Sequence, residues 1–120
     1  MAESKIDLGK KTLSKLLAGY KTGNKLPDRF GKMTLEHLFG DLWQGDALAI
    51  EERSLITCTV LVALGREAEQ RIHFRGARNL GIPREKLEEV LTHVAHYAGW
   101  PAAVSGFRIL DEVWTAMDQE

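Results

Sequence analysis

The chain has 120 residues, of which 44% are hydrophobic and 28% are charged, and its formal net charge is −1. These values are ordinary for a globular domain with a real core, and they exclude a disordered or collagen-like chain. The one cysteine, Cys58, excludes an intrachain disulfide and a cysteine-rich zinc site.

The charge is divided unevenly along the chain. Residues 1–32 carry eight Lys and Arg against three Asp and Glu, whereas residues 33–120 carry eight against fourteen. We therefore separate a basic amino-terminal helix and linker, 1–32, from a helical region, 33–120, within what is a single domain overall. The lysines follow an amphipathic pattern without interleaved aromatic residues. This favours a solvated helix face, or one docked on an acidic neighbouring subunit, over nucleic-acid binding.

No segment predicts export or membrane insertion. The first eleven residues lack the apolar centre of a signal peptide, and the uncharged apolar run at residues 54–65 is too short to span a bilayer. We expect a cytoplasmic protein with no membrane contact.

Every periodic segment predicts a helix. Ser4 is suited to cap a first helix that runs to about Tyr20, and Gly23-Asn24 and Pro27-Asp28 then interrupt the pattern. Thr34 is suited to cap a short helix that ends near Trp43.

The next helix is expected from about residue 50, where Glu51 and Glu52 favour a start, to Gly65. It is apolar almost all round, which predicts a place at the centre of the core.

The helix from about residue 66 to Gly81 predicts a buried polar pair. At about 100° per residue, the small and apolar residues Ala68, Ile72, Gly76 and Leu80 share a stripe, and Glu69 and His73 fall within it. Phe74 falls on the opposite side and is expected to face outward.

Two further helices complete the pattern. One begins at Pro83 and ends at Gly99, and it places His96 on its outer face. The last helix carries apolar residues at alternating steps of four and three, typical of lengthwise packing on a partner: Ala103, Phe107, Leu110, Trp114 and Met117. An outward Phe74 and His96 suit a subunit interface.

Candidate chemistry centres on Glu69 and His73. Their spacing of four residues also suits an ordinary helix-stabilising pair, so the structural alternative stays open. His93, on the flank of its helix, is likewise either structural or catalytic. Together with Arg53, these residues supply a carboxylate, imidazoles and a guanidinium for acid–base work on an anionic substrate.

Metal and nucleophile chemistry are not expected. The four histidines lack the spacing of known zinc or di-iron motifs, no serine lies in a Gly-x-Ser-x-Gly turn, and Cys58 lies in mid-helix as a buried, inert thiol. Trp43 and Trp100 are core or pocket-wall aromatics by their positions at element ends.

Five segments together resemble carboxymuconolactone decarboxylases. They are Gly-Asp-Leu-Trp (40–43), Glu-Arg-Ser-Leu-Ile-Thr (52–57), Ala-Leu-Gly-Arg (63–66), Arg-Ile-His-Phe-Arg-Gly-Ala-Arg-Asn-Leu-Gly (71–81) and Glu-Glu-Val-Leu-Thr-His-Val-Ala-His-Tyr-Ala-Gly-Trp-Pro-Ala-Ala (88–103). The resemblance implies an all-α, AhpD-like bundle of about six helices, assembled as trimers or hexamers with sites near subunit contacts.

The decarboxylase branch converts 4-carboxymuconolactone to a β-ketoadipate enol-lactone, in the catabolism of aromatic compounds and without a cofactor. The resemblance therefore implies a lyase that decarboxylates this lactone or a related small acid. Laid over the family positions, the chemistry predicts Glu69, His73 and His93 as catalytic residues. The substrate-binding residues are then expected to be Arg53, Trp43, Tyr97 and Trp100.

Two alternatives remain on the same fold. One is a non-catalytic oligomeric protein that binds a small ligand. The other is an AhpD-like peroxidase, which the sequence disfavours because Arg66 and Glu69 stand where that branch has its Cys-x-x-Cys pair.

Overall fold

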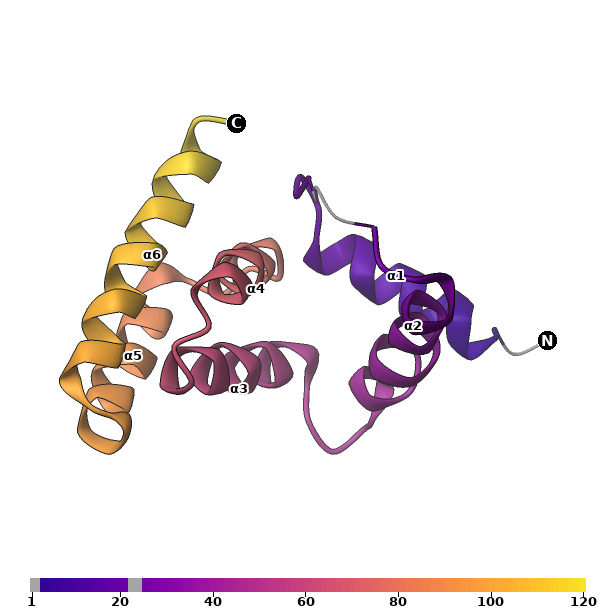
Figure 1. The fold of residues 1–120 in the computed structure, drawn as a ribbon, viewed down its shortest axis with the longest axis horizontal. Helices are drawn as coiled ribbons and strands as arrows, with labels where there is room; N and C mark the ends of the chain where they lie inside the picture. Colours follow the sequence, from indigo (N-terminus) through magenta and orange to yellow (C-terminus); the bar gives the residue numbers. More distant parts are fainter. Residues whose placement is uncertain (1–2, 22–24) are drawn as a thin grey trace.

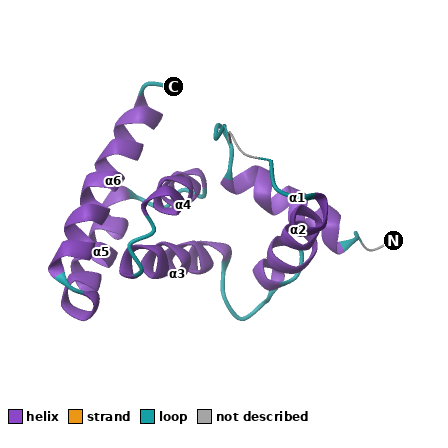
Figure 2. Ribbon diagram, viewed as in Figure 1, coloured by secondary structure: helices purple, strands orange, loops and turns teal. Residues whose placement is uncertain are grey.

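The computed structural model describes residues 3–21 and 25–120, and these form helices joined by short connections (Figure 2). The described part of the chain contains no strand, so the predicted all-helical class with six α-helices is confirmed. The elements are α1 (Lys5–Leu16), α2 (Asp28–Met33), the π-helix η1 (Thr34–Phe39), the 3-10 helix η2 (Leu42–Gln44), α3 (Ile50–Ala63), α4 (Glu67–Asn79), α5 (Arg84–Ala98) and α6 (Trp100–Asp118). No helix within these ranges is long and apolar enough to cross a membrane.

The molecule is elongated. Figure 1 shows α1 and α2 at one end, α5 and α6 at the other, and α3 and α4 between them. The principal extents are 47 × 32 × 25 Å and the radius of gyration is 14.8 Å, against about 13.6 Å for a compact 120-residue domain. An elongated chain exposes more surface per residue, so apolar side chains on its outer faces are to be expected.

The amino-terminal lobe comprises α1, α2, η1 and η2, and the helices α3 to α6 form the bundle. The first helix of the lobe starts where the sequence predicts but ends earlier. The Asp7 N–H donates to Ser4 Oγ at 3.1 Å, which confirms the Ser4 cap. However, α1 ends at Leu16, earlier than expected, and the Gly23-Asn24 break lies outside the described residues.

The Thr34 cap was wrong. The helix already begins at Asp28, after Pro27, and continues without a break from α2 into η1. Thr34 lies inside it, and its Oγ1 donates to the Phe30 carbonyl at 2.8 Å. A threonine hydroxyl can bond a carbonyl one turn back as well as cap a helix.

Two apolar clusters hold the fold together. The smaller one joins Leu16, Phe39 and Trp43 in the lobe. The larger one lies among α3 to α6 and comprises Cys58, Val62, Phe74, Ala77, Ile82, Leu87, Leu91, Val94, Ile109, Leu110 and Val113. Four residues of the seam predicted for the last helix belong to this larger cluster or pack against it: Phe107, Leu110, Trp114 and Met117.

The ends of the bundle helices follow their glycines and prolines. Gly65, with φ of +69°, follows α3, and Gly99, with φ of +108°, separates α5 from α6. Pro101 occupies the first turn of α6, where a missing N–H costs no hydrogen bond. At the start of α3, the Ala49 N–H donates to Glu52 Oε1 at 2.8 Å.

The lobe and the bundle meet at the end of α4. Gly76 lies against the Leu16 side chain. The Asn79 side-chain amide donates to the carbonyls of Leu16, at 2.7 Å, and Ala18, at 3.0 Å. These carbonyls lie at the end of α1, where intrahelical donors run out.

The outward orientation expected for Phe74 was wrong. Its exposed fraction is 0%, and Gln70 and Ala77 share its buried face, whereas Ile72 is half-buried. Because α4 packs on α3, α6 and the end of α1, its buried arc is wider than the stripe centred on Ile72.

The central place expected for the apolar helix α3 was also wrong. Ser54, Cys58 and Val62 are buried, but Ile56, Val60 and Leu64 are 48%, 48% and 68% exposed. One side of α3 therefore forms an apolar stripe on the surface.

Candidate functional site

The helical hairpin α3–α4 positions the predicted catalytic pair. The Gln70 side-chain amide donates to the Leu61 carbonyl at 3.2 Å, and the Cys58 thiol donates to the His73 carbonyl at 3.5 Å. From the first pair to the second, the residue number rises by three on α4 and falls by three on α3, so the two helices run antiparallel. This packing fixes the backbone at His73 against the middle of α3.

His73 is half-buried, and its Nδ1 is buried with no hydrogen-bond partner among the described residues. Burial lowers the pKa of the His73 imidazole, and the nearby Glu69 carboxylate opposes this shift. The imidazole is therefore neutral at pH 7, and in that state it carries one N–H donor.

Glu69 is oriented by Arg66. Arg66 Nε donates to Glu69 Oε1 at 3.2 Å, one turn apart at the start of α4, and the Glu69 side chain is 42% exposed. Among the described residues no hydrogen bond or ion pair joins Glu69 to His73, so the carboxylate acts on the imidazole through its charge. Arg66 was not among the predicted site residues, although its spacing of three residues from Glu69 is a signal for such a pair.

Cys58 is a packing residue of the hairpin, as predicted. Burial raises the pKa of its thiol to about 12. At neutral pH the thiol is protonated, and a protonated buried thiol is a poor nucleophile.

Of the two other predicted residues in this region, Arg53 lies on α3 and Trp43 lies on η2, before the loop that leads to α3. Arg53 Nη2 donates to the Gly45 carbonyl at 3.3 Å, and its Nε is buried without a partner in the described structure. Trp43 is buried beside Phe39, with ring centroids 5.6 Å apart. Trp43 thus belongs to the core of the lobe, and a wall position for substrate stays a prediction.

His93, Tyr97 and Trp100 form a second group at the α5–α6 corner. The His93 and Tyr97 rings stack at 5.0 Å, and His96 meets Trp100 edge-on at 5.4 Å. All four side chains are exposed, which confirms the outward position of His96. No hydrogen bond, ion pair or ring contact of the described residues joins this group to Glu69 or His73.

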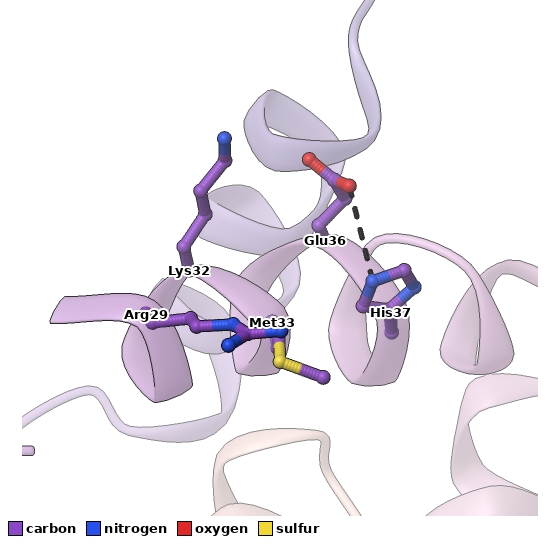
Figure 3. Close-up of a pocket in the computed structure, with 5 residues that line it drawn as sticks. All are labelled: Arg29, Lys32, Met33, Glu36 and His37. Carbon is purple, nitrogen blue, oxygen red and sulfur yellow. Dashed lines mark ion pairs between the residues drawn. The ribbon is translucent and has the colours of Figure 1, made fainter. Parts of the chain in front are cut away.

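Two surface hollows lie elsewhere. One, of about 280 Å³, is lined by Arg29, Lys32, Met33, Glu36 and His37 on α2 and η1 (Figure 3). The other, of about 170 Å³, lies where Tyr20 approaches Arg71 and Arg75 of α4 and the carboxyl-terminal half of α6. The predicted site residues line neither. In the described ranges, no three His, Cys, Asp or Glu side chains gather as a metal site would require.

Comparison with known proteins shows a family for this helical chain. The model of the family described as carboxymuconolactone decarboxylase matches residues 28–112. The chain is 34% identical over 107 residues to the 4-carboxymuconolactone decarboxylase of Acinetobacter baylyi, covering 89% of this chain and 78% of that protein. It is 30% identical over 73 residues to the nitrosuccinic acid decarboxylase npaB of Metarhizium robertsii, covering 61% and 51% respectively.

The chain therefore belongs to the carboxymuconolactone decarboxylase family. Both relatives carry the name of a decarboxylase, and they are named for different acids. The matched region includes α3, α4 and α5, which hold most of the predicted site residues.

Proposed function

We propose that this protein decarboxylates a small carboxylic acid, with a lactone acid such as 4-carboxymuconolactone as the first candidate. The observation that carries this proposal is the half-buried, neutral His73 beside the Glu69–Arg66 pair, within the region that matches the family. The names of the two relatives support the reaction type, and the substrate is our inference.

The reaction sets three requirements. The bond between the ring carbon and its carboxylate breaks, CO₂ leaves, and the electron pair spreads through the conjugated ring to the lactone carbonyl oxygen. The ring carbon next to the lactone carbonyl then takes a proton, which gives the enol-lactone. The protein must therefore bind the carboxylate, donate a hydrogen bond to the developing oxyanion and deliver the proton.

We assign the oxyanion to His73. A neutral imidazole donates one N–H, and partial burial strengthens that donor against the charge that develops in the transition state. Arg53 is proposed to bind a substrate carboxylate through its guanidinium, whose one hydrogen bond among the described residues is to the Gly45 carbonyl. Glu69 or His93 is proposed to deliver the proton.

We propose no cofactor, because the substrate's own carbonyl accepts the electron pair. The AhpD-like peroxidase alternative is disfavoured because this chain lacks the Cys-x-x-Cys pair of that branch. Arg66 and Glu69 stand at those cysteine positions and form an ion pair with each other, and the thiol of Cys58 is buried in the hairpin.

We also propose that the chain assembles as a homo-oligomer, a trimer or a hexamer, of AhpD-like protomers. The exposed apolar stripe on α3 and the exposed aromatic residues of the α5–α6 corner support this proposal.

A non-catalytic ligand-binding protein is the second candidate. The observation in its favour is that His93 and Tyr97 form a group of their own, without a contact to His73 among the described residues. In that case a carboxylate ligand would bind and remain unchanged.

The test is release of CO₂ from 4-carboxymuconolactone, with the fall in lactone absorbance followed in parallel. His73→Ala is expected to lower kcat by about 10²–10³, the usual effect of removing one oxyanion donor. Cys58→Ala is the matched control on the facing helix, and we expect it to retain the wild-type rate. Normal turnover by His73→Ala would refute the assignment, and binding without turnover by the wild type would favour the second candidate.

A further inference from the structure

We propose that two different faces of this chain bind each other between copies, so that the assembly is head-to-tail. We define the lobe face as Leu26, Arg29, Phe30, Lys32 and Met33, and the corner face as Glu85, Glu89, Tyr97, Trp100 and Val104. The lobe face of one copy is proposed to bind the corner face of a second copy. This inference rests on the homo-oligomer proposed above and specifies its contact.

The lobe face combines apolar side chains with cations. Phe30 and Met33 lie about one turn apart on α2 and Leu26 lies just before it; the three are about half exposed, at 53%, 48% and 50%. Arg29, Lys32 and Met33 line the same hollow, in which Arg29 lies beside Met33 and Lys32 extends outward (Figure 3). Neither Arg29 nor Lys32 forms an ion pair within the described residues, so both cations are free to bind an external partner.

The corner face combines aromatic side chains with carboxylates. Tyr97 is 85% exposed and Trp100 is 61% exposed, unusually high values for residues that contribute so much when an interface buries them. Glu85, Glu89 and Tyr97 follow one another at multiples of four residues along the outer face of α5. The two glutamates are exposed and form no ion pair among the described residues.

Charge selects the pairing of unlike faces. In an isologous contact each lobe face would meet another lobe face, and Arg29 and Lys32 would repel their copies. A contact between a lobe face and a corner face brings these cations to Glu85 and Glu89. A guanidinium or ammonium above the ring of Tyr97 or Trp100 adds a cation–π attraction.

The apolar stripe on α3 is the competing surface. Ile56, Val60 and Leu64 offer aliphatic area but no exposed aromatic ring for a cation to cover. We therefore assign the corner face, and the competing surface becomes an outcome of the test.

The consequence for the proposed site is direct. His93 stacks on Tyr97, and both side chains are exposed in a single copy. A second copy on the corner face would cover them and exclude water. A head-to-tail contact repeats from copy to copy and closes into a ring when its rotation allows.

The experiment measures molar mass by light scattering during size-exclusion chromatography, with helicity followed by circular dichroism. The wild type is expected at a multiple of 13.4 kDa. Arg29→Glu with Lys32→Glu, and separately Glu85→Lys with Glu89→Lys, are expected to shift the mass toward a single copy. The quadruple variant restores opposite charges between the two faces and is expected to recover the wild-type mass.

The control changes the same number of charges elsewhere in the lobe. Lys10 and Lys15 are exposed on α1 and form no ion pair in the described part of the chain. Reversal of both to glutamate is therefore expected to leave the mass unchanged.

Several results would overturn the pairing. These are an unchanged mass in either double variant, no recovery in the quadruple variant, or an equal loss in the Lys10 and Lys15 control. Loss of mass on Val60→Asp with unchanged masses in the charge variants would assign the contact to α3 instead. A monomeric wild type would refute the homo-oligomer itself, whereas an oligomeric wild type that ignores the charge variants would refute this pairing alone.

Discussion

Truncation of Phe74 to alanine tests the packing of α4. Phe74 is fully buried in the larger core cluster, and Phe→Ala at such a site costs about 3–5 kcal/mol. A 120-residue domain has a total stability of about 6–18 kcal/mol, so this loss is a large part of the whole. With an unfolding entropy of about 0.25 kcal/mol/K for this length, Tm should fall by roughly 12–20 °C.

Ile72→Ala is the matched control, two residues away on the same helix. The helical-wheel argument from the sequence placed Ile72 at the centre of the buried stripe, but the structure leaves it half-buried. We expect a cost of about 1–2.5 kcal/mol, roughly half of that for a fully buried aliphatic side chain, and a fall in Tm of roughly 4–10 °C.

The measurement is thermal unfolding by circular dichroism, at one protein concentration for all variants because association raises the apparent Tm. If Ile72→Ala lowers Tm as much as Phe74→Ala or more, the buried face of α4 is wrongly assigned, and with it the side of the helix on which His73 lies.

Two further predictions concern titration and reactivity. Because burial lowers the pKa of His73 below its ordinary value of 6.5, the unfolded chain takes up the proton first. Stability is then fully present above pH 6.5 and falls as the pH drops below it, by at most about 1.4 kcal/mol per pH unit for one proton. His73→Gln should show a shallower fall between pH 7 and pH 5 in urea unfolding, and parallel curves for the two proteins would contradict the burial argument. Cys58, whose thiol pKa is raised to about 12, should resist a disulfide reagent at pH 8 in the native protein and react at once in denaturant; rapid labelling of the folded chain would show that α3 and α4 separate readily.

The sequence predicted where helices begin and end better than which side of each helix is buried. Gly65 and Gly99 end α3 and α5 because their positive φ angles suit glycine, and this signal is local. The Thr34 cap was wrong because a threonine hydroxyl has two options: it can accept from an N–H at a helix start, or donate to a carbonyl one turn back inside a helix. Thr34 does the second. A helix start is therefore best predicted where several local signals agree.

The orientation of a helix depends on how many neighbours it has. For α4, three neighbours bury Phe74 and Ala77 as well as the side near Gly76, so one apolar stripe could not describe it. For α3, apolar residues on all sides indicated burial without saying what covers each side, and Val60 lies on the surface of a single copy.

The candidate site was partly predictable for the same reason. The proximity of Glu69 to His73 follows from their spacing, which one helix fixes. The preference of Glu69 for Arg66, and the position of His93 with Tyr97, depend on side-chain choices between competing partners. Those choices are decided by tertiary packing, which a linear pattern does not contain.

The side-chain amide of Asn79 links the amino-terminal lobe to the bundle and so affects how cooperatively the chain unfolds. Its hydrogen bonds to the Leu16 and Ala18 carbonyls, with Gly76 against the Leu16 side chain, tie the small lobe cluster to the bundle. The lobe cluster has three buried side chains, with four partly buried ones packed against it: Leu13, Leu17, Ile50 and Leu80. Because it is smaller than the bundle cluster, we expect the lobe to open before the bundle unfolds. One amide, placed 63 residues from Leu16 along the chain, therefore does much to set whether the lobe and the bundle open as one cooperative unit or two.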